Sequence, residues 1–211
     1  MPSDLNAVKT LPLADARYHH GALRQALIAA AEAELVERGV ERFSLRATAR
    51  RAGVSPAAPA HHFGDSRGLL TAVATAAFVD FANALASADA NAGRSRKRRV
   101  EAQGLAYVGF ALAHTARFEL MWRRALLDVC DPEFEAAADA AFAVLERATG
   151  GGGKGPLDAP DRLPSATAVA CWSIVHGFAR LAIDGSFGTG DQAARAAADA
   201  LLPAVLGHLK I

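Results

Sequence analysis

Residues 44–63 carry the feature that most constrains how this chain folds: two short helical segments separated by a tight turn. Ser44 and Ser55 each precede a helical pattern, where a serine hydroxyl can accept a hydrogen bond from an unpaired backbone N–H of the first turn. Gly53 lies between the segments and can adopt the positive φ that ends the first helix. This order predicts a helix-turn-helix, a motif whose second helix lies in the DNA major groove.

The first of these segments separates small apolar residues from arginines. Its apolar residues recur at helical spacing and can face a small core: Leu45, Ala49 and Ala52. Its basic residues are expected to project outward: Arg46, Arg50 and Arg51. Helix–glycine–helix segments also occur in all-α proteins that bind no DNA, so this pattern alone leaves both interpretations open. Residues 20–39 favour DNA binding, because they predict a long amphipathic helix that supplies the third helix of a small core.

The second segment, residues 56–63, contains two prolines that restrict where a helix can begin. With Ser55 as the cap, Pro56 occupies the first helical position, where its missing N–H costs nothing. Pro59 then forfeits only the first intrahelical hydrogen bond. We therefore expect a short helix that begins at Pro56.

Histidines are the main polar side chains of this second helix. Ala57 and its neighbouring alanines offer at most a methyl contact to thymine, so His61 and His62 are expected to supply the polar base contacts. Over residues 17–67, eight arginines accompany five acidic residues, although the net charge of the whole chain is only +1. This modest local excess suits the neutralisation of a few phosphates.

A short basic and aromatic lead-in, residues 17–20, precedes the long first helix. We expect it to lie along the phosphate backbone or to enter the adjacent minor groove, with a disordered tail as the alternative. Adjacent histidine pairs lack the i, i+4 spacing of a helical zinc site, so we expect no metal. The predicted DNA-contacting residues are Arg17, Tyr18, His19, Ser44, Arg46, Arg50, Ser55, Pro56, Ala57, His61, His62 and Arg67.

Several short motifs follow one another along residues 18–75. After the basic lead-in come a helix ending in Glu-Arg-Gly-Val, then Phe-Ser-Leu-Arg, Ala-Gly-Val-Ser and His-Phe-Gly-Asp. In order and spacing they closely resemble the tetracycline-repressor (TetR) family of bacterial regulators. The stretch from Trp172 to Gly177 is similar to the Trp-His-Gly element of one ligand-binding-domain subgroup. The resemblance implies an all-helical homodimer that binds a palindromic operator and releases it when a small ligand binds.

Two positions depart from the pattern of that family. Ala60 lies where an aromatic residue, most often tyrosine, usually contacts phosphate, and Ser66 lies near a usual lysine, for which Arg67 can partly substitute. The loss of two phosphate contacts implies weaker and less salt-dependent binding. An alternative function therefore stays open: a helical small-molecule sensor or interaction protein with lost or weak DNA binding.

From Gly68 onward the pattern is helix after helix. Helical patterns cover residues 68–91, 100–115, 132–148, 165–185 and 191–209, and residues 149–164 are rich in glycine and proline and predict a loop. The expected fold class is all-α. Residues 18–66 are expected to form a three-helix helix-turn-helix DNA-binding head, and residues 67–211 a larger helical body for ligand binding and dimerisation.

The aromatic residues of the body are numerous enough to line a cavity. Ligand pockets are mostly apolar with a few polar groups, and this body offers both. The predicted ligand-binding residues are Phe78, Phe81, Tyr107, Phe110, His114, Phe118, Met121, Trp122, Trp172 and His176. Further candidates are Phe178, Arg117 and Cys171. Aromatic residues at helical spacing also form ordinary core, and a histidine held by a backbone carbonyl is the alternative for His176.

The last two helices carry small residues that could pair with a second copy as a four-helix bundle with twofold symmetry. On the final helix these residues are Ala194, Ala198, Leu201 and Val205. Packing inside one subunit is the alternative, and the family resemblance, rather than the periodicity, favours the dimer. The expected partners are thus a double-stranded DNA operator, a small-molecule effector of unknown identity and a second copy.

Other classes of protein fit the sequence less well. The chain has no run of 18 apolar residues and no signal-peptide pattern, and its two cysteines suit a reducing compartment, so we expect a cytoplasmic protein that does not enter membranes. Nothing marks a nucleophile with its base, and neither a phosphate-binding glycine loop nor a Glu-x-x-His metal motif is present. We therefore expect that the protein is not an enzyme and binds no cofactor. A repressor is the favoured reading, with activation left open.

Overall fold

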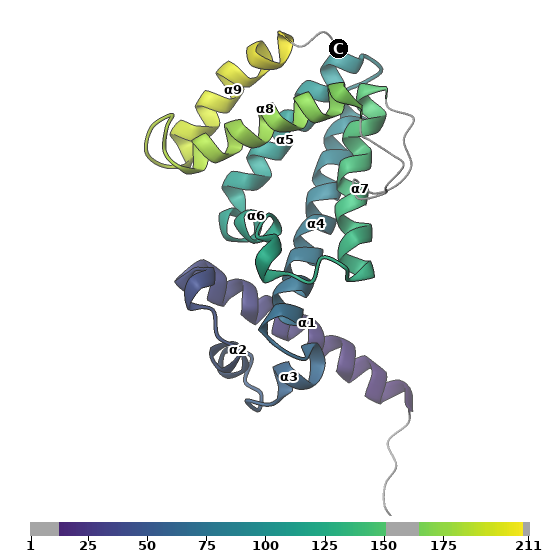
Figure 1. Cartoon of the computed structure of the whole chain (residues 1–211), viewed down its shortest axis with the longest axis vertical. Helices are drawn as coiled ribbons and strands as arrows, with labels where there is room; N and C mark the ends of the chain where they lie inside the picture. Colours follow the sequence, from purple (N-terminus) through teal and green to yellow (C-terminus); the bar gives the residue numbers. More distant parts are fainter. Residues whose placement is uncertain (1–12, 151–164, 209–211) are drawn as a thin grey trace, which may run out of the picture.

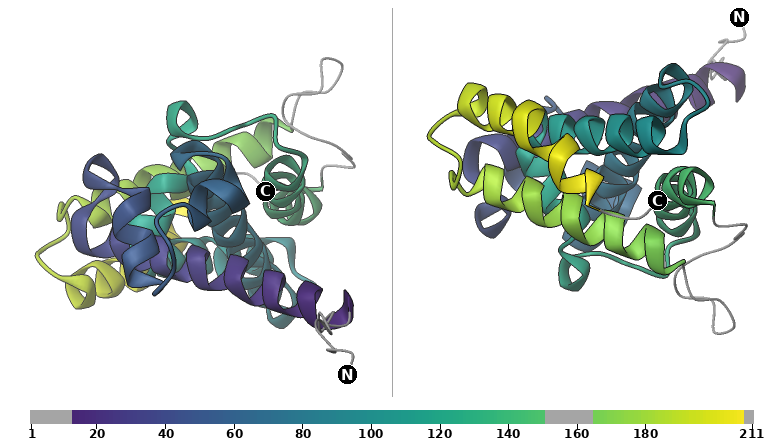
Figure 2. Two further views of the ribbon diagram at one scale, coloured as in Figure 1. Left: turned by 90° about the horizontal axis from the view of Figure 1, so that it is seen from below. Right: turned by 90° about the horizontal axis from the view of Figure 1, so that it is seen from above.

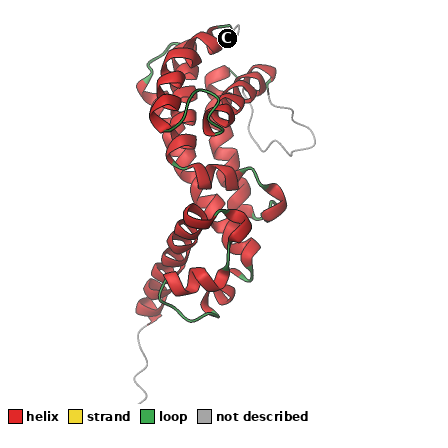
Figure 3. Cartoon of the chain, turned by 90° about the vertical axis from the view of Figure 1, so that its left-hand side faces the viewer, coloured by secondary structure: helices red, strands yellow, loops and turns green. Residues whose placement is uncertain are grey.

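The computed structural model describes residues 13–150 and 165–208, with side chains from Gly21 onward (Figure 1). These residues form an all-helical protein, and the described part contains no strand (Figure 3). The elements are α1 (Leu13–Arg38), η1 (Val40–Arg42), α2 (Leu45–Arg51), α3 (Ala58–Phe63), α4 (Ser66–Asn91), α5 (Arg96–Ala113), α6 (Thr115–Met121), η2 (Arg124–Leu126), α7 (Pro132–Thr149), α8 (Ala166–Ile183) and α9 (Asp191–Gly207). Helices α1–α3 lie at one end, α5–α9 lie at the other, and α4 connects them (Figure 1).

Helix α1 begins earlier than the sequence pattern predicts. It starts at Leu13, so Arg17, Tyr18 and His19 lie in its first turns and not in an extended lead-in. The reason is that residues 13–20 contain no glycine or proline and include several good helix formers. The side chains of these three residues lie outside the described ones, and their predicted DNA contacts stay a prediction.

The start of the helix-turn-helix is as predicted. Ser44 caps α2, because its hydroxyl accepts a hydrogen bond from the Ala47 N–H at 3.4 Å. Gly53 has a φ of 69° and reverses the chain after α2. Ala49 is fully buried, which confirms that this face of α2 points into the core.

The predicted start of α3 is wrong. Ser55 does not cap it: the helix begins at Ala58, with Ala57 at the N-cap position, and residues 55–58 form a turn closed by a 3.0 Å backbone hydrogen bond. This later start places Pro59 in the first helical turn, where backbone N–H groups need no intrahelical partner. Pro56 therefore lies in the turn and not at the first helical position.

The body is organised around α4, which packs along α7 and α5 (Figures 1 and 2). One buried apolar cluster runs from α1 through α4 into the body, and it includes Ile28 and Leu35 of α1 together with Leu69 and Leu70 of α4. The N-terminal part of α4 is thus held to the head by apolar packing. The rest of α4 faces the body.

Helix α9 packs differently from the prediction. Ala194 and Ala198 are only 2% and 4% exposed within a single chain, because α9 lies against α5. Close packing is possible at Gly104 of α5, where a Cβ atom would approach Leu206 Cδ1 to 2.9 Å. The alanine face was therefore wrongly expected to pair with a second copy, whereas Leu201 of the same helix is exposed.

Two helices, α4 and α8, are long and apolar enough to cross a bilayer by length and composition. Core helices of soluble proteins meet the same criteria, and α4 is such a core helix. Helix α8 is less covered, since only 33% of its apolar window is buried in the chain. A part of its apolar surface therefore faces outward.

Candidate functional site

The outward surface of the helix-turn-helix collects most of the predicted DNA-contacting residues. Arg46 and Arg50 of α2 are exposed, as is His61 of α3, while His62 is half-buried. The turn before α3 exposes further predicted residues: Ser55, Pro56 and Ala57. Both helices lie at the end of the molecule away from the body (Figure 1). This surface offers two arginines, two imidazoles and small side chains that permit close approach of a partner.

Arg51, which the pattern placed on the outside, has a different role. It forms ion pairs with Glu37 and with Glu34 of α1, the latter at 3.5 Å. The hydrogen bond from Arg51 holds the pKa of Glu37 below its usual value. Glu34 is almost fully buried and also lies 3.2 Å from Arg38. Arg51 thus fastens α2 to α1, and Arg46 and Arg50 are the arginines of α2 that project outward.

Two other arginines connect helices around this surface. The guanidinium of Arg24 lies over the ring of Phe63, 5.4 Å from its centre, and so links α1 to the end of α3. Arg67 donates a hydrogen bond to the backbone oxygen of Ala125 at 3.1 Å. Arg67 is therefore engaged with η2 of the body, and its predicted phosphate contact stays a prediction.

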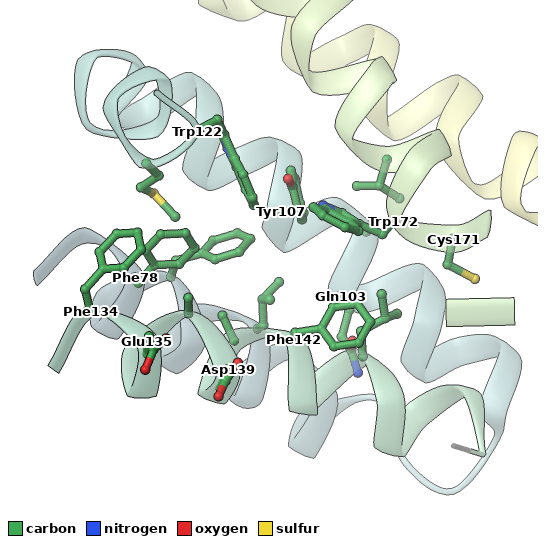
Figure 4. A pocket seen from close by; sticks show the side chains of 18 of the residues that line it. Phe78, Gln103, Tyr107, Trp122, Phe134, Glu135, Asp139, Phe142, Cys171 and Trp172 are labelled. Atoms are coloured by element: carbon green, nitrogen blue, oxygen red, sulfur yellow. The ribbon is translucent and has the colours of Figure 1, made fainter. Parts of the chain in front are cut away.

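A cavity of about 220 Å³ lies in the body between α4, α5, α7, α8 and the end of α6 (Figure 4). Its wall is mainly aromatic and aliphatic. Six of the ten predicted ligand-binding residues line it: Phe78, Phe81, Tyr107, Met121, Trp122 and Trp172. Cys171, a further candidate, also lines it.

Four predicted ligand-binding residues lie outside the cavity wall. Phe118 is completely buried, with its ring centre 5.7 Å from that of Tyr107 and 5.6 Å from that of His176. Phe110 and His114 pack against each other at the C-terminal end of α5, with ring centres 4.9 Å apart, and the Phe110 ring centre lies 5.1 Å from that of Phe81. These aromatic residues support the wall from behind. They were expected in the wall because helical spacing does not reveal which neighbouring helix a side chain faces.

His176 stands behind the wall in contact with Tyr107. Its Nδ1 atom and the Tyr107 hydroxyl are hydrogen-bonded at 2.8 Å, so the partner is a phenol and not the backbone carbonyl considered from the sequence. Burial, with a smaller contribution from Arg180, lowers the pKa of His176. Burial raises the pKa of Tyr107. Both shifts favour a neutral pair that fixes the position of the Tyr107 ring in the wall.

The sequence reasoning missed the α7 side of the cavity and one buried amide. Phe134 and Phe142 of α7 line the cavity, together with the carboxylates Glu135 and Asp139. Gln103 of α5 lines it as well. A signal for Gln103 was present, because it is a polar residue on the otherwise apolar stripe of α5. Glu135 and Asp139 share an i, i+4 spacing that places them on one side of α7.

The segment 115–126, which contains α6 and η2, connects the cavity to the head. Met121 and Trp122 of this segment line the cavity. Arg117 of the same segment, only 14% exposed, forms ion pairs with Glu32 of α1 at 3.4 Å and with Asp80 of α4 at 2.6 Å. Arg123 pairs with Glu41 beside the helix-turn-helix. The segment therefore contacts both the cavity and the head.

Comparisons with known proteins agree with this architecture. The family description "Bacterial regulatory proteins, tetR family" matches residues 27–73, and "Tetracyclin repressor-like, C-terminal domain" matches residues 100–205. Among curated proteins, none matches the chain. Membership of the Trp-His-Gly subgroup stays a prediction.

Solved structures share the fold over most of the chain. A protein of unknown function from Rhodococcus sp. RHA1 is 35% identical, with 86% of this chain and 94% of that chain covered and a TM-score of 0.68. A TetR family transcription regulator from Marinobacter aquaeolei VT8 is 17% identical, with 87% and 95% covered and a TM-score of 0.59. The multidrug binding protein EbrR, complexed with imidazole, is 17% identical, with 92% and 95% covered and a TM-score of 0.59. The head, the helical body and both family matches together show that this chain belongs to the TetR family of bacterial transcription regulators.

Proposed function

We propose that this protein is a cytoplasmic transcriptional repressor that binds a palindromic operator as a homodimer and releases it when a small molecule fills the cavity. The observation that carries the proposal is the shared segment 115–126, which lines the cavity at Met121 and Trp122 and is ion-paired to the head through Arg117 and Arg123. The structure of EbrR with imidazole shows that a protein of this fold can hold a small aromatic molecule. We assign the protein no catalytic activity.

In this proposal residues 18–66 form the DNA-binding head and residues 67–211 the ligand-binding and dimerisation body. The head contacts DNA through the exposed surface of α2, the following turn and α3. Arg46 and Arg50 lie where they can neutralise phosphates, and His61 and His62 of α3 are the polar groups for base edges. We expect His62→Ala to change sequence preference, while Arg46→Ala weakens all DNA binding.

The dimer is proposed to form through the uncovered faces of α8 and α9. Three of the large apolar residues exposed on the described surface lie on these helices: Val169 and Leu181 on α8 and Leu201 on α9, which are 37%, 49% and 46% exposed. The two helices lie side by side on the outside of the body (Figures 1 and 2). A second copy that covers both faces explains why a helix as apolar as α8 is left so exposed in one chain.

The test is DNA binding by the full-length protein to the region upstream of its own gene. Fluorescence anisotropy and footprinting should detect protection of two half-sites about 34–36 Å apart, one per reading head. The double variant Arg46→Ala with Arg50→Ala should lose most of this binding. Arg195→Ala, an exposed arginine of α9 remote from the head, is the matched control and should bind like the parent. Absence of any DNA binding by a folded dimer would refute the repressor assignment.

A helical sensor with weak or lost DNA binding is the second candidate, and Ala60 favours it. Ala60 is exposed on α3 and has no polar group to contact phosphate. The slope of log K against log salt concentration separates the candidates, because each phosphate contact adds about 0.9 to its magnitude. A flat slope with no preference for the upstream region would favour the sensor.

A further inference from the structure

We infer that the cavity takes an uncharged aromatic molecule of one or two rings that donates a hydrogen bond to Gln103 and accepts one from Trp122. The inference depends on the proposed function in one respect only: under that function, the bound molecule is the effector. Its structural basis is a pair of buried polar atoms, Gln103 Oε1 and Trp122 Nε1, which belong to residues of the cavity wall and have no protein partner.

The amide of Gln103 is oriented by its own hydrogen bonds. Its side-chain nitrogen donates to Asp89 Oδ1 at 2.6 Å and, more weakly, to the Val144 backbone oxygen at 3.5 Å. Asp89 accepts two hydrogen bonds from Arg99. Hydrogen bonding from Arg99 lowers the pKa of Asp89, so this neighbour is an ionised acceptor. The amide nitrogen must therefore point to Asp89, which leaves Oε1 as an unused acceptor in a residue only 3% exposed.

The indole of Trp122 supplies the complementary group. Its Nε1–H can only donate a hydrogen bond, and it is buried without an acceptor. Buried polar atoms without partners are rare and unfavourable, and water is the natural partner for them in a cavity that can admit it. Neither atom is accessible in the structure, so the side chains of Gln103 and Trp122 must turn slightly before a molecule with a matching donor and acceptor can pair with them and add apolar contact with the rings around it.

The size of the cavity limits the molecule to one or two rings. Drug-sized ligands occupy pockets of roughly 300–1,000 Å³, whereas a dry cavity of about 150 Å³ holds benzene. The present cavity, at about 220 Å³, lies between these values. In Figure 4, Trp122 lies toward one end of the wall and Gln103 toward the other, with aromatic rings between them. The donor and the acceptor of the molecule should thus lie on different rings.

The charged residues of the wall disfavour an anion. They comprise two carboxylates, Glu135 and Asp139, and one guanidinium, Arg124. A carboxylate ligand would meet a net negative surround, and neither unused atom offers it a positive charge. An uncharged molecule fits the two neutral hydrogen-bonding groups.

Five two-ring probes of similar shape test the inference by isothermal titration calorimetry on the full-length protein. They are 6-hydroxyquinoline, with a donor and an acceptor on different rings, 2-naphthol, quinoline, naphthalene and 2-naphthoate. We expect 6-hydroxyquinoline to bind about tenfold more tightly than 2-naphthol or quinoline, which each lack one of the two groups. Naphthalene should bind more weakly still, and 2-naphthoate least of all. Trp122 and Trp172 are the two tryptophans of the chain, and both line the cavity, so quenching of their fluorescence shows that a probe enters it.

The variant Trp122→Phe removes the indole N–H and keeps an aromatic ring in the wall. It should abolish the preference for 6-hydroxyquinoline over 2-naphthol. Trp172→Phe is the matched control: it makes the same change in cavity volume at an indole whose N–H is not a buried unpaired group, and it should weaken both probes equally. Because the readout is a ratio of two affinities within one variant, a general loosening of the wall does not mimic the expected result.

Equal affinity for naphthalene and 6-hydroxyquinoline, tighter binding of 2-naphthoate, an unchanged ratio in Trp122→Phe, or binding of none of the probes would each overturn the inference. These outcomes are independent of DNA. If 6-hydroxyquinoline binds with the expected dependence on Trp122 but leaves DNA affinity unchanged, the inference about the cavity stands and the proposed coupling to DNA fails.

Discussion

Replacement of Gly68 by alanine should destabilise the junction between the reading head and α4. Gly68 lies in the first turn of α4, and its N–H donates to the Asp65 side chain at 2.9 Å. A Cβ atom at this position would lie well inside van der Waals contact of the Phe63 backbone oxygen and 3.1 Å from the carbonyl carbon. Phe63 is the last residue of α3, so a backbone group and not a flexible side chain must move. The substitution therefore has to displace α3 relative to α4.

Two opposing effects set the size of the change. Alanine ordinarily stabilises a helix by about 0.8–1.0 kcal/mol relative to glycine. Forcing an extra carbon into a filled space typically costs about 1–3 kcal/mol, and more where the backbone must shift. The clash is between the new Cβ atom, whose position is fixed by the backbone of residue 68, and the backbone of Phe63, so no side-chain rotation can relieve it. We therefore expect the clash to prevail, with a net loss of about 1–2 kcal/mol and a fall in Tm of roughly 2–8 °C.

Gly109→Ala provides the matched control. Gly109 also lies inside a helix, α5, but a Cβ atom there meets nothing within 4 Å. This variant should gain up to about 1 kcal/mol and raise Tm. Differential scanning calorimetry gives both shifts, and anisotropy with upstream DNA tests whether Gly68→Ala also loses affinity because α3 is displaced. If Gly68→Ala is as stable as Gly109→Ala and binds DNA normally, the close approach of Phe63 to α4 does not exist in solution.

Three further variants test the surface, the dimer and the coupling. Arg46→Ala should weaken operator and non-specific DNA alike and reduce the salt slope by roughly one; an unchanged slope would remove Arg46 from the phosphate contacts. Leu201→Glu should dissociate the dimer in sedimentation because it buries a charge against a second copy, whereas Val79→Glu, also at an exposed apolar position but on α4, should not. Glu32→Gln should reduce ligand-induced release of DNA about two- to fivefold by removing the charge that faces α6. Glu101→Gln, in an ion pair between two residues of α5, should leave release unchanged; equal release in both variants would exclude this path.

Most of the fold could be predicted from the sequence because helix ends and apolar periodicity are local signals. Ser44 marks the beginning of α2 and Gly53 follows its end, each by its own chemistry, and both behave as expected. The start of α3 was missed although it too is local. Two prolines three residues apart allow two starts, and the structure takes the one that spares the hydrogen bond of Pro59.

The site was less predictable, because periodicity shows that a side chain is buried but not which helix it meets. Phe110 and Phe142 are both aromatic residues on amphipathic helices, yet only Phe142 lines the cavity. Ala198 shows the same limit. Its burial depends on the packing of α9 against α5, a helix that is distant in sequence. The close approach of the two helices at Gly104, where a Cβ atom would meet Leu206, is a property of the tertiary structure.

The strength of the contacts around the DNA-binding head indicates how a small difference in ligand-binding free energy can change the orientation of the head. The head follows the N-terminal part of α4 through buried apolar residues such as Leu35 and Leu69, and this attachment resembles the core of any domain. The attachment to segment 115–126 is polar by contrast, and Arg123 and Glu41 are both exposed. Ion pairs at exposed positions usually contribute about 0.2–1 kcal/mol each. Because a coupling of about 1–3 kcal/mol changes DNA affinity roughly 5- to 150-fold, the rearrangement of a few such pairs is of the size that a regulatory switch requires. A ligand that shifts Trp122 against Phe78 of α4 would therefore act on these polar contacts, while the buried apolar cluster that joins α1 to the N-terminal part of α4 stays in place.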